Sequence, residues 1–298
     1  MKLQALSSVA VFAVAGLALT GCETEYTVGI RKPAASSVAP AALASPSPSP
    51  SAVVCDPLNG GGSSGQSSST NGIVGSMYYL DANNPNGYRS TDDYIQHGHS
   101  PADVSFIFNQ LNVPTTLFSQ GFQLPDGSFL EDNLGNKLTS FFGFHFTTTL
   151  ALGSDDSAGL YQLGTLSDDG MSVRLVKPDG SLDSLIEDDG DEHSVKMACA
   201  GRAVPFDSTT RVPVEINWHQ GPPMRLAMML IWRKVSGTAD SLGDKYCGVA
   251  DKVNYFDAST TPSTPKQYWL DLQAHGWKVV APSNFIMPGD HQNTCAKN

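Results

Sequence analysis

The stretch from Tyr161 to Trp232 constrains the fold of this chain most, because its apolar residues recur in short alternating runs. One run ends at a Ser-Asp-Asp-Gly turn, residues 167–170, and residues 171–176 supply its partner. Arg211–Trp218 alternates again, and the loop His219–Pro223 leads into an apolar run. A period of two residues is that of a β-strand. The pattern therefore predicts strands arranged around one acidic turn and one Gly/Pro loop.

The same pattern extends over most of the chain. Residues 72–80 begin the folded part, and Phe141–Leu152 is rich in aromatic and β-branched residues. Turn signals recur roughly every ten residues, which is typical of a β-sandwich. We therefore predict an all-β sandwich over residues 72–235. In residues 236–298, Thr264-Pro265 and Gly276 mark the two ends of a short helix, so we expect a small C-terminal extension packed on the sandwich.

The N-terminus predicts export and a lipid anchor. After Lys2, the apolar run Ala5–Ala18 is too short to span a bilayer. Leu19-Thr20-Gly21-Cys22 then resembles the lipobox of bacterial lipoproteins. The resemblance implies a signal peptide over residues 1–21, and Cys22 as the lipidated residue that attaches the protein to the membrane. The alternative is an ordinary secretory signal with a chance cysteine.

The surroundings of Cys22 give the expected location. Glu23 favours the outer membrane or cell surface, and a domain that faces the periplasm is the alternative. Residues 22–71 are rich in Pro, Ser and Gly, a composition that cannot form a core and predicts a disordered tether.

Charge and cysteine usage narrow the function further. The net charge is −11 and no Lys/Arg cluster is visible, which excludes nucleic acid as a partner. Four cysteines follow Cys22, and an even number in an exported protein predicts two disulfides with three possible pairings. We favour Cys55–Cys295, which would tie the start of the folded part to its end, together with Cys199–Cys247.

Four features, in this order, resemble the protective-antigen fourteen-kilodalton domain. This β-sandwich occurs in anthrax-toxin protective antigen, yeast flocculin-type adhesins and many bacterial surface proteins. The features are the opening run Gly72–Tyr79, the strand and acidic turn Tyr161–Gly170, the Asp-Gly hairpin with the acidic loop that follows it (179–193), and the strand, loop and strand of Pro213–Trp232. The resemblance covers about Gly72 to Lys234.

The resemblance implies a calcium site. In the lectin-like members, two consecutive Asp residues joined by a cis peptide hold calcium, a neighbouring Asn assists, and the ion binds sugar hydroxyls. The Asp pair corresponds to Asp168 and Asp169, and Gln220 stands where the lectins carry Asn. Calcium takes roughly six to eight oxygen ligands, which suits adjacent carboxylates. The alternative is that the pair only shapes a turn by accepting backbone N–H bonds.

Other residues near these loops are weaker candidates. Trp218, His219 and Gln220 border the loop and would contact the ligand, with Trp218 stacking on a sugar face. The alternative places Trp218 in the core. The acidic run Glu187–His193 could bind calcium too, but we expect it to be a solvated loop because it lacks the features of an EF-hand.

These observations predict a surface-anchored lipoprotein whose sandwich binds carbohydrate, with calcium as cofactor, a glycan as partner and adhesion as the role. The alternative is a structural or protein-binding envelope lipoprotein with no metal-dependent ligand. We expect no enzymatic activity, because the glycosidases of the family carry this domain beside a large catalytic domain for which this chain has no room. An unrecognised hydrolase is the third hypothesis.

Overall fold

The computed structural model describes residues 52–58, 68–81, 84–222, 225–237, 239–250, 254–289 and 291–296. The predicted signal peptide, Cys22 and most of the predicted tether lie outside these residues, so the lipid anchor stays a prediction. No helix within the described ranges has the length and apolar character needed to cross a membrane.

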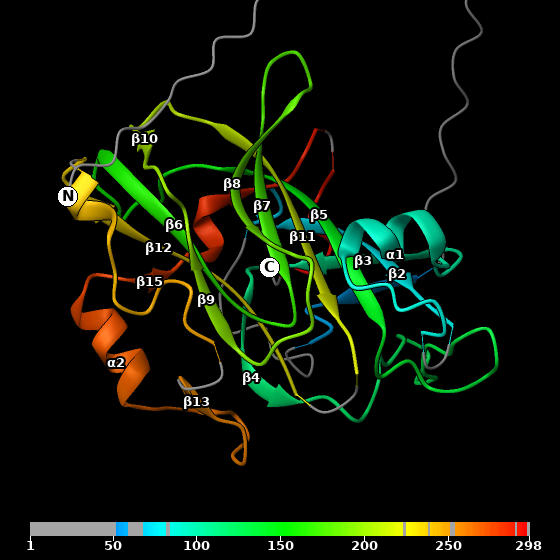
Figure 1. The fold of residues 1–298 in the computed structure, drawn as a ribbon. Helices are drawn as coiled ribbons and strands as arrows, with labels where there is room; N and C mark the ends of the chain where they lie inside the picture. Colours follow the sequence, from blue (N-terminus) through cyan, green and yellow to red (C-terminus); the bar gives the residue numbers. More distant parts are fainter. Residues whose placement is uncertain are drawn as a thin grey trace, which may run out of the picture. The chain divides into compact units, whose positions relative to one another are not determined.

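Two β-sheets stack as a sandwich, as the sequence predicts (Figure 1). The larger sheet has the order β1 (Ala52–Cys55), β3 (Val104–Phe108), β2 (Ile73–Tyr79), β5 (Phe142–Leu150), β11 (Val212–Gln220), β7 (Met171–Val176) and β8 (Leu182–Asp188), and β16 (Phe285–Ile286) pairs with β5. The smaller sheet has the order β10 (Val204–Phe206), β6 (Gly159–Asp168), β12 (Arg225–Val235) and β15 (Lys278–Val279); β4 (Asn112–Leu117) pairs with β12, and β9 (Lys196–Cys199) pairs with β6.

The remaining elements are short. α1 (Thr91–His97) lies beside β2 and β11, and α2 (Gln267–Ala274) lies in the C-terminal extension (Figure 1). Two single-turn 3₁₀ helices span Ala239–Leu242 and Pro282–Asn284, and β13 (Phe256–Asp257) pairs with β14 (Thr264–Pro265). α2 falls where the Thr-Pro start and the Gly276 stop predict a helix.

Aromatic side chains from neighbouring strands fill the space between the sheets. Alternate residues of β5, Phe142, Phe144 and Phe146, are fully buried. Phe144 packs edge-on against Phe106, and Phe146 against Phe108, with ring centroids 5.3 and 5.0 Å apart. Burying one such side chain stabilises a fold by roughly 1.5–3 kcal/mol. The alternation read from the sequence thus places these rings in the core.

The folded part begins earlier than Gly72. Ala52–Cys55, which the sequence assigns to the tether, forms β1 and pairs in parallel with β3. This run has only four residues between Ser/Pro-rich and Gly/Ser-rich segments, so its alternation is too short to read from the sequence. Pairing with β3, which is distant in the chain, is what makes it a strand.

Two disulfides and two short strands fix the C-terminal residues. The disulfides are Cys55–Cys295 and Cys199–Cys247, the pairing that the sequence favours. β15 extends the smaller sheet and β16 the larger one, so the extension contributes to both sheets. Its apolar residues, including Trp269 and Trp277, form a second cluster over the outer face of the smaller sheet. The extension is therefore a part of the sandwich.

Candidate functional site

The acidic turn lies where the chain crosses from one sheet to the other. Asp168 is the last residue of β6, Asp169 follows it, and β7 begins at Met171 in the opposite sheet. The peptide bond between Asp168 and Asp169 is cis, as the family resemblance implies. The pair therefore stands at one end of the sandwich, next to the loops that leave β8 and β11.

A cavity of about 320 Å³ opens beside this pair. Its lining comes from three places in the chain: the end of β6, the loop between β8 and β9, and the segment from the end of β11 to the start of β12. The lining residues are Asp168, Asp169, Glu192, His193, Ser194, Gln220, Pro222 and Arg225. The three residues predicted to hold a metal, Asp168, Asp169 and Gln220, thus line one cavity.

The carboxylate of Asp169 joins two of these loops. The residue is 5% exposed; Oδ1 accepts the backbone N–H of His193 at 2.9 Å, and Oδ2 accepts that of Gly221 at 2.7 Å. A Cβ at Gly221 would lie 3.1 Å from Asp169 Oδ2, so glycine permits this close approach. Asp169 therefore has the turn-shaping contacts of the structural alternative. Because each carboxylate oxygen has two acceptor sites, these bonds leave room for a further ligand.

Gln220 presents an unused acceptor. The residue is 2% exposed, and its Nε2 donates to the carbonyl of Pro222 at 2.8 Å. Its Oε1 is buried without a hydrogen-bond partner in the described part of the chain. Leaving a buried acceptor unsatisfied costs about 1–3 kcal/mol, so such atoms call for an explanation. A cation or a donor group in the cavity would satisfy this oxygen.

A buried polar cluster supports the site from behind. Asp189 Oδ1 lies 2.7 Å from His219 Nδ1 and accepts the backbone N–H of Thr91, at the start of α1, at 3.0 Å. A Cβ at Gly170 would lie 2.9 Å from Cα of Asp189, so only glycine fits between the acidic turn and this loop. The prediction of a solvated loop over Glu187–His193 is wrong for Asp189, which is anchored inside, although Asp191 and Glu192 are exposed.

Two predicted ligand contacts are wrong. Trp218 is fully buried, donates its Nε1–H to the carbonyl of Ala227 at 2.9 Å and packs against Phe142 in the core. His219 is fully buried as well, because Tyr94 of α1 packs on its ring at a centroid distance of 5.4 Å. Neither side chain can touch a ligand in the cavity. The alternative that placed Trp218 in the core is the correct one.

The electrostatic setting of the cavity is negative. Burial raises the pKa of the Tyr94 hydroxyl, and the nearby charges of Asp169 and Glu192 raise it further. In the described part of the chain, no group of three or more His, Cys, Asp or Glu residues is arranged to hold a metal ion. Two carboxylates and one amide oxygen are nevertheless the hard oxygen donors that calcium accepts, and backbone carbonyls can complete such a set. The oxygen donors of Asp168, Asp169 and Gln220 are therefore of the chemical type that calcium binds.

Sequence reasoning did not place the other lining residues in the site. Glu192 and His193 belong to the acidic run 187–193, which was considered as a calcium site but expected to be a solvated loop; they reach the cavity because the loop after β8 folds over the Asp pair. Arg225, an isolated arginine at the start of an apolar run, gave no signal.

No family model matches the chain, and no curated protein does either. Solved structures do match. A PA14 sugar-binding domain from an RTX adhesin is 17% identical, with 55% of this chain and 90% of that chain covered and a TM-score of 0.37. The PA14 domain of the antifreeze protein MpAFP is 15% identical, with 59% and 86% covered and a TM-score of 0.36.

The Epithelial Adhesin 6 A domain of Candida glabrata, in complex with Galβ1-3GlcNAc, is 16% identical; 64% of this chain and 98% of that chain are covered, and the TM-score is 0.32. At these identities the similarity concerns the fold alone.

Proposed function

We propose that this PA14-like sandwich is a calcium-dependent carbohydrate-binding module of an adhesin at the cell surface. The observation that carries the proposal is that Asp168, Asp169 and Gln220 line one cavity and that the buried Oε1 of Gln220 has no hydrogen-bond partner among the described residues. These residues supply oxygen donors from two loops, and the Gln220 oxygen is buried and has no partner among the described residues. Such a set favours a bound cation over a turn that is stabilised by backbone hydrogen bonds alone. The anchor at Cys22 and the export signal belong to the same proposal.

The residues of the site would have two roles, binding the ion and positioning the loops. Asp168, Asp169 and Gln220 would hold the ion, which when bound would supply coordination positions for sugar hydroxyls. Asp169 also ties the loops after β8 and β11 to the acidic turn through its two backbone hydrogen bonds. The cavity of about 320 Å³ is at the small end of ligand sites, which suits one or two sugar rings.

The alternative function is structural. Both oxygens of Asp169 already accept backbone N–H bonds, which is what a carboxylate that only shapes a turn would do. In that case the sandwich would serve as a protein-binding or spacing domain of the envelope.

Thermal unfolding with calcium and with chelator separates the two functions. A ligand that binds only the folded state, at a hundredfold excess over its dissociation constant, stabilises it by about 2.7 kcal/mol. We expect Asp168→Asn and Gln220→Met to abolish this gain. Asp191→Asn is the matched control, because its side chain is 81% exposed in the same loop region. The absence of any calcium effect on the native chain would leave the structural alternative.

A glycan array then tests the ligand. We expect calcium-dependent binding of one group of glycans, lost with chelator and in Asp168→Asn. A calcium effect on unfolding without binding to any glycan would keep the metal site and reject the carbohydrate ligand.

A further inference from the structure

One arginine, Arg225, lines this acidic cavity. Arg225, the first residue of β12, is exposed and lines the cavity with Asp168 and Asp169. Its side chain forms no hydrogen bond, and no ion pair within 4 Å, with any residue that the structure describes. Hydrogen bonds from Ser259 lower the pKa of Asp257, and the charge of Arg225 lowers it further, but the hydrogen bonds of this carboxylate go to Ser259 and not to the guanidinium. The guanidinium therefore keeps its donors available.

Strand register places Arg225 on the same face as the acidic turn. On β12, Ala227 pairs with Asp168, and Arg225 lies two residues before Ala227. Residues two apart on a strand project from the same face, and diagonal neighbours on adjacent strands lie roughly 7–8 Å apart. The carboxylate of Asp168 and the guanidinium of Arg225 thus flank the cavity from one face of the smaller sheet. A ligand in the cavity could therefore contact both side chains.

An exposed apolar residue adjoins the arginine. Leu117 of β4 pairs directly with Arg225, and its side chain is 58% exposed, one of the few large apolar side chains on the surface of the described residues. Directly paired residues project from the same face. Arg225 and Leu117 therefore offer a charged donor and an apolar surface side by side, which suits the polar edge and the C–H face of a sugar ring.

A neutral sugar offers a guanidinium only hydroxyl and ring oxygens, whereas an anionic group adds an opposite charge and a second acceptor oxygen. Guanidinium binds carboxylate or sulfate oxygens through two parallel N–H bonds, and these charge-assisted bonds are stronger than neutral ones. Resting on the proposed function, we propose that Arg225 makes the cavity selective for sugars that carry an anionic group. The ring hydroxyls would face Asp168 and Asp169, the anionic group would pair with Arg225, and the ring would pack on Leu117.

Matched sugars test the selectivity directly. Titration calorimetry on the calcium-loaded full chain would compare methyl galactoside with methyl galacturonide and with galactose 6-sulfate. We expect at least one anionic sugar to bind about tenfold more tightly than the neutral one, the value of one charge-assisted hydrogen bond. The two anionic arms show whether carboxylate or sulfate is preferred, and tighter binding of either one supports the proposal. Equal or tighter binding of the neutral sugar overturns it.

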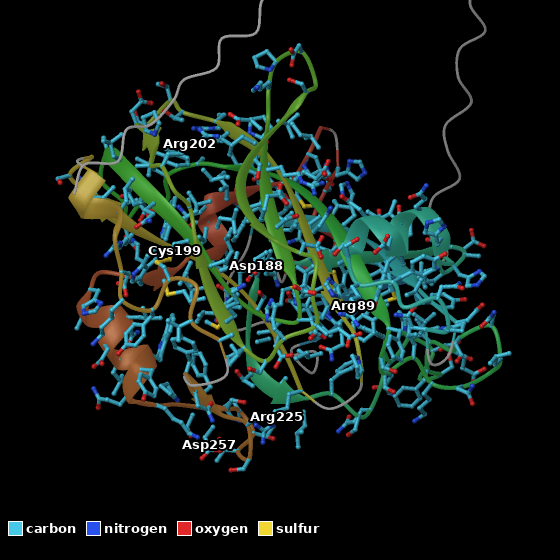
Figure 2. The ribbon with its side chains drawn as sticks, in the orientation of Figure 1. Arg89, Asp188, Cys199, Arg202, Arg225 and Asp257 are labelled. Carbon is cyan, nitrogen blue, oxygen red and sulfur yellow. A yellow bond between two sulfur atoms is a disulfide. The ribbon has the colours of Figure 1, made fainter. Side chains whose placement is uncertain are left out.

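Variants then assign the effect to the residue. Arg225→Gln should weaken binding of the anionic sugar more than binding of the neutral sugar and so remove the preference, whereas Arg225→Lys should keep part of it. Arg202→Gln is the control, because it makes the same charge change at the opposite end of the molecule (Figure 2). Both side chains are exposed, so unfolding curves should match those of the native chain. If Arg225→Gln keeps the preference, the assignment is wrong.

These experiments distinguish a failure of the Arg225 proposal from a failure of the proposed function. If calcium stabilises the chain but the neutral sugar binds as tightly as the anionic sugars or more tightly, the calcium site is kept and selection by Arg225 is rejected. Binding of anionic sugars that depends on Arg225 but not on calcium would keep the selection and reject the ion. No binding of any sugar, on the array or in the calorimeter, rejects both.

Discussion

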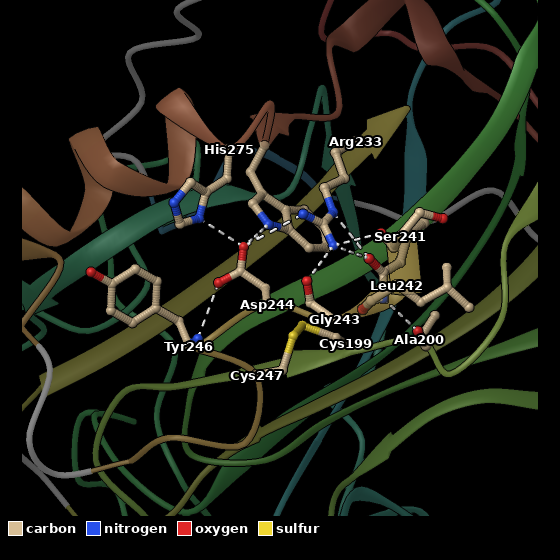
Figure 3. The surroundings of a disulfide bond; sticks show 12 residues. Cys199, Ala200, Arg233, Ser241, Leu242, Gly243, Asp244, Tyr246, Cys247 and His275 are labelled. Atoms are coloured by element: carbon tan, nitrogen blue, oxygen red, sulfur yellow. Dashed lines mark hydrogen bonds and ion pairs between the residues drawn. A yellow bond between two sulfur atoms is a disulfide. The ribbon is translucent and has the colours of Figure 1, made fainter. Parts of the chain in front are cut away.

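Two buried aspartates in this molecule have opposite surroundings. Asp244, in the C-terminal extension, has a side chain that is 1% exposed and that receives four donors. Its Oδ1 accepts the backbone N–H of Tyr246, and its Oδ2 accepts Nε1–H of Trp277 and lies 2.9 Å from His275 Nδ1 and 3.6 Å from the Arg233 guanidinium (Figure 3). This carboxylate is saturated, and the contacts it makes hold the extension on the sheet beside the Cys199–Cys247 disulfide.

Asp169 is almost as buried, but it receives only two backbone N–H bonds, and no cationic side chain among the described residues lies within ion-pair distance. It borders a cavity, next to an amide oxygen that has no partner. A saturated carboxylate stabilises the fold, whereas a carboxylate that is left partly unpaired beside a cavity is available to a ligand. On these contacts, Asp244 has a structural role, whereas Asp169 has the surroundings that the proposed ligand requires.

The largest effect should come from Asp244→Ala. The change leaves the buried guanidinium of Arg233 without its carboxylate, and breaking a buried ion pair in this way costs about 3–5 kcal/mol. Denaturant unfolding at neutral pH measures the loss. Asp191→Ala, at an exposed position, should change the free energy of unfolding by less than about 0.5 kcal/mol. If both variants lose less than about 0.5 kcal/mol in the free energy of unfolding, Asp244 does not stabilise the fold, and the contrast with Asp169 is wrong.

Gly170→Ala should have the next largest effect. The added Cβ would lie 2.9 Å from the Cα of Asp189 and 2.6 Å from the ring of His219, so the backbone behind the site must shift, at a cost of about 1–3 kcal/mol. Gly190→Ala, in the same loop, is the control because its Cβ would meet nothing within 4 Å. Equal unfolding curves for the two variants would show that the acidic turn and this loop are not tightly packed.

Asp169→Asn should cost less than Asp244→Ala. The amide keeps one acceptor for a backbone N–H and leaves the other N–H unsatisfied, so we expect a loss of about 1 kcal/mol in calcium-free buffer. The stabilisation by calcium should vanish at the same time. A loss as large as that of Asp244→Ala, with the calcium effect intact, would make Asp169 a structural residue and reverse the comparison.

The smallest effect is a dependence on pH. Burial alone would raise the pKa of Asp244, but the hydrogen bonds from Tyr246, Trp277 and His275 outweigh it and hold this pKa below its ordinary value. A lowered folded-state pKa contributes stability above the unfolded value of about 3.9, and that contribution disappears as the pH falls through the folded value. As the pH falls below about 4, Asp244→Asn should therefore lose less stability than the native chain. Parallel acid-unfolding curves would contradict this.

Local patterns were enough to predict much of the fold. The period-two alternation gave the strands β6, β7, β11 and β12, and the Thr-Pro start and Gly276 gave α2. The two favoured disulfide pairs are present as well. These features depend on residues that are close in sequence, or on the simple rule that one crosslink ties the start of the fold to its end.

The site was harder to predict. The alternation of β11 places Trp218 in the core, but it cannot reveal that α1 covers His219 on the other face of the strand. The run 187–193 was expected to be a solvated loop because it lacks the features of an EF-hand, although Asp189 is bound by His219 and by the start of α1. Both errors arise because burial at these positions comes from elements distant in the chain.

The sequence by itself determined the strand pattern and the acidic turn of this protein, because alternation and turn chemistry are properties of neighbouring residues. Only the tertiary structure decided which groups meet at the cavity. The backbone N–H groups that bind Asp169 lie 24 and 52 residues further along the chain, and strand register places Arg225 on the face of Asp168. A binding site of this kind depends on the packing of loops from different strands, which no local pattern encodes.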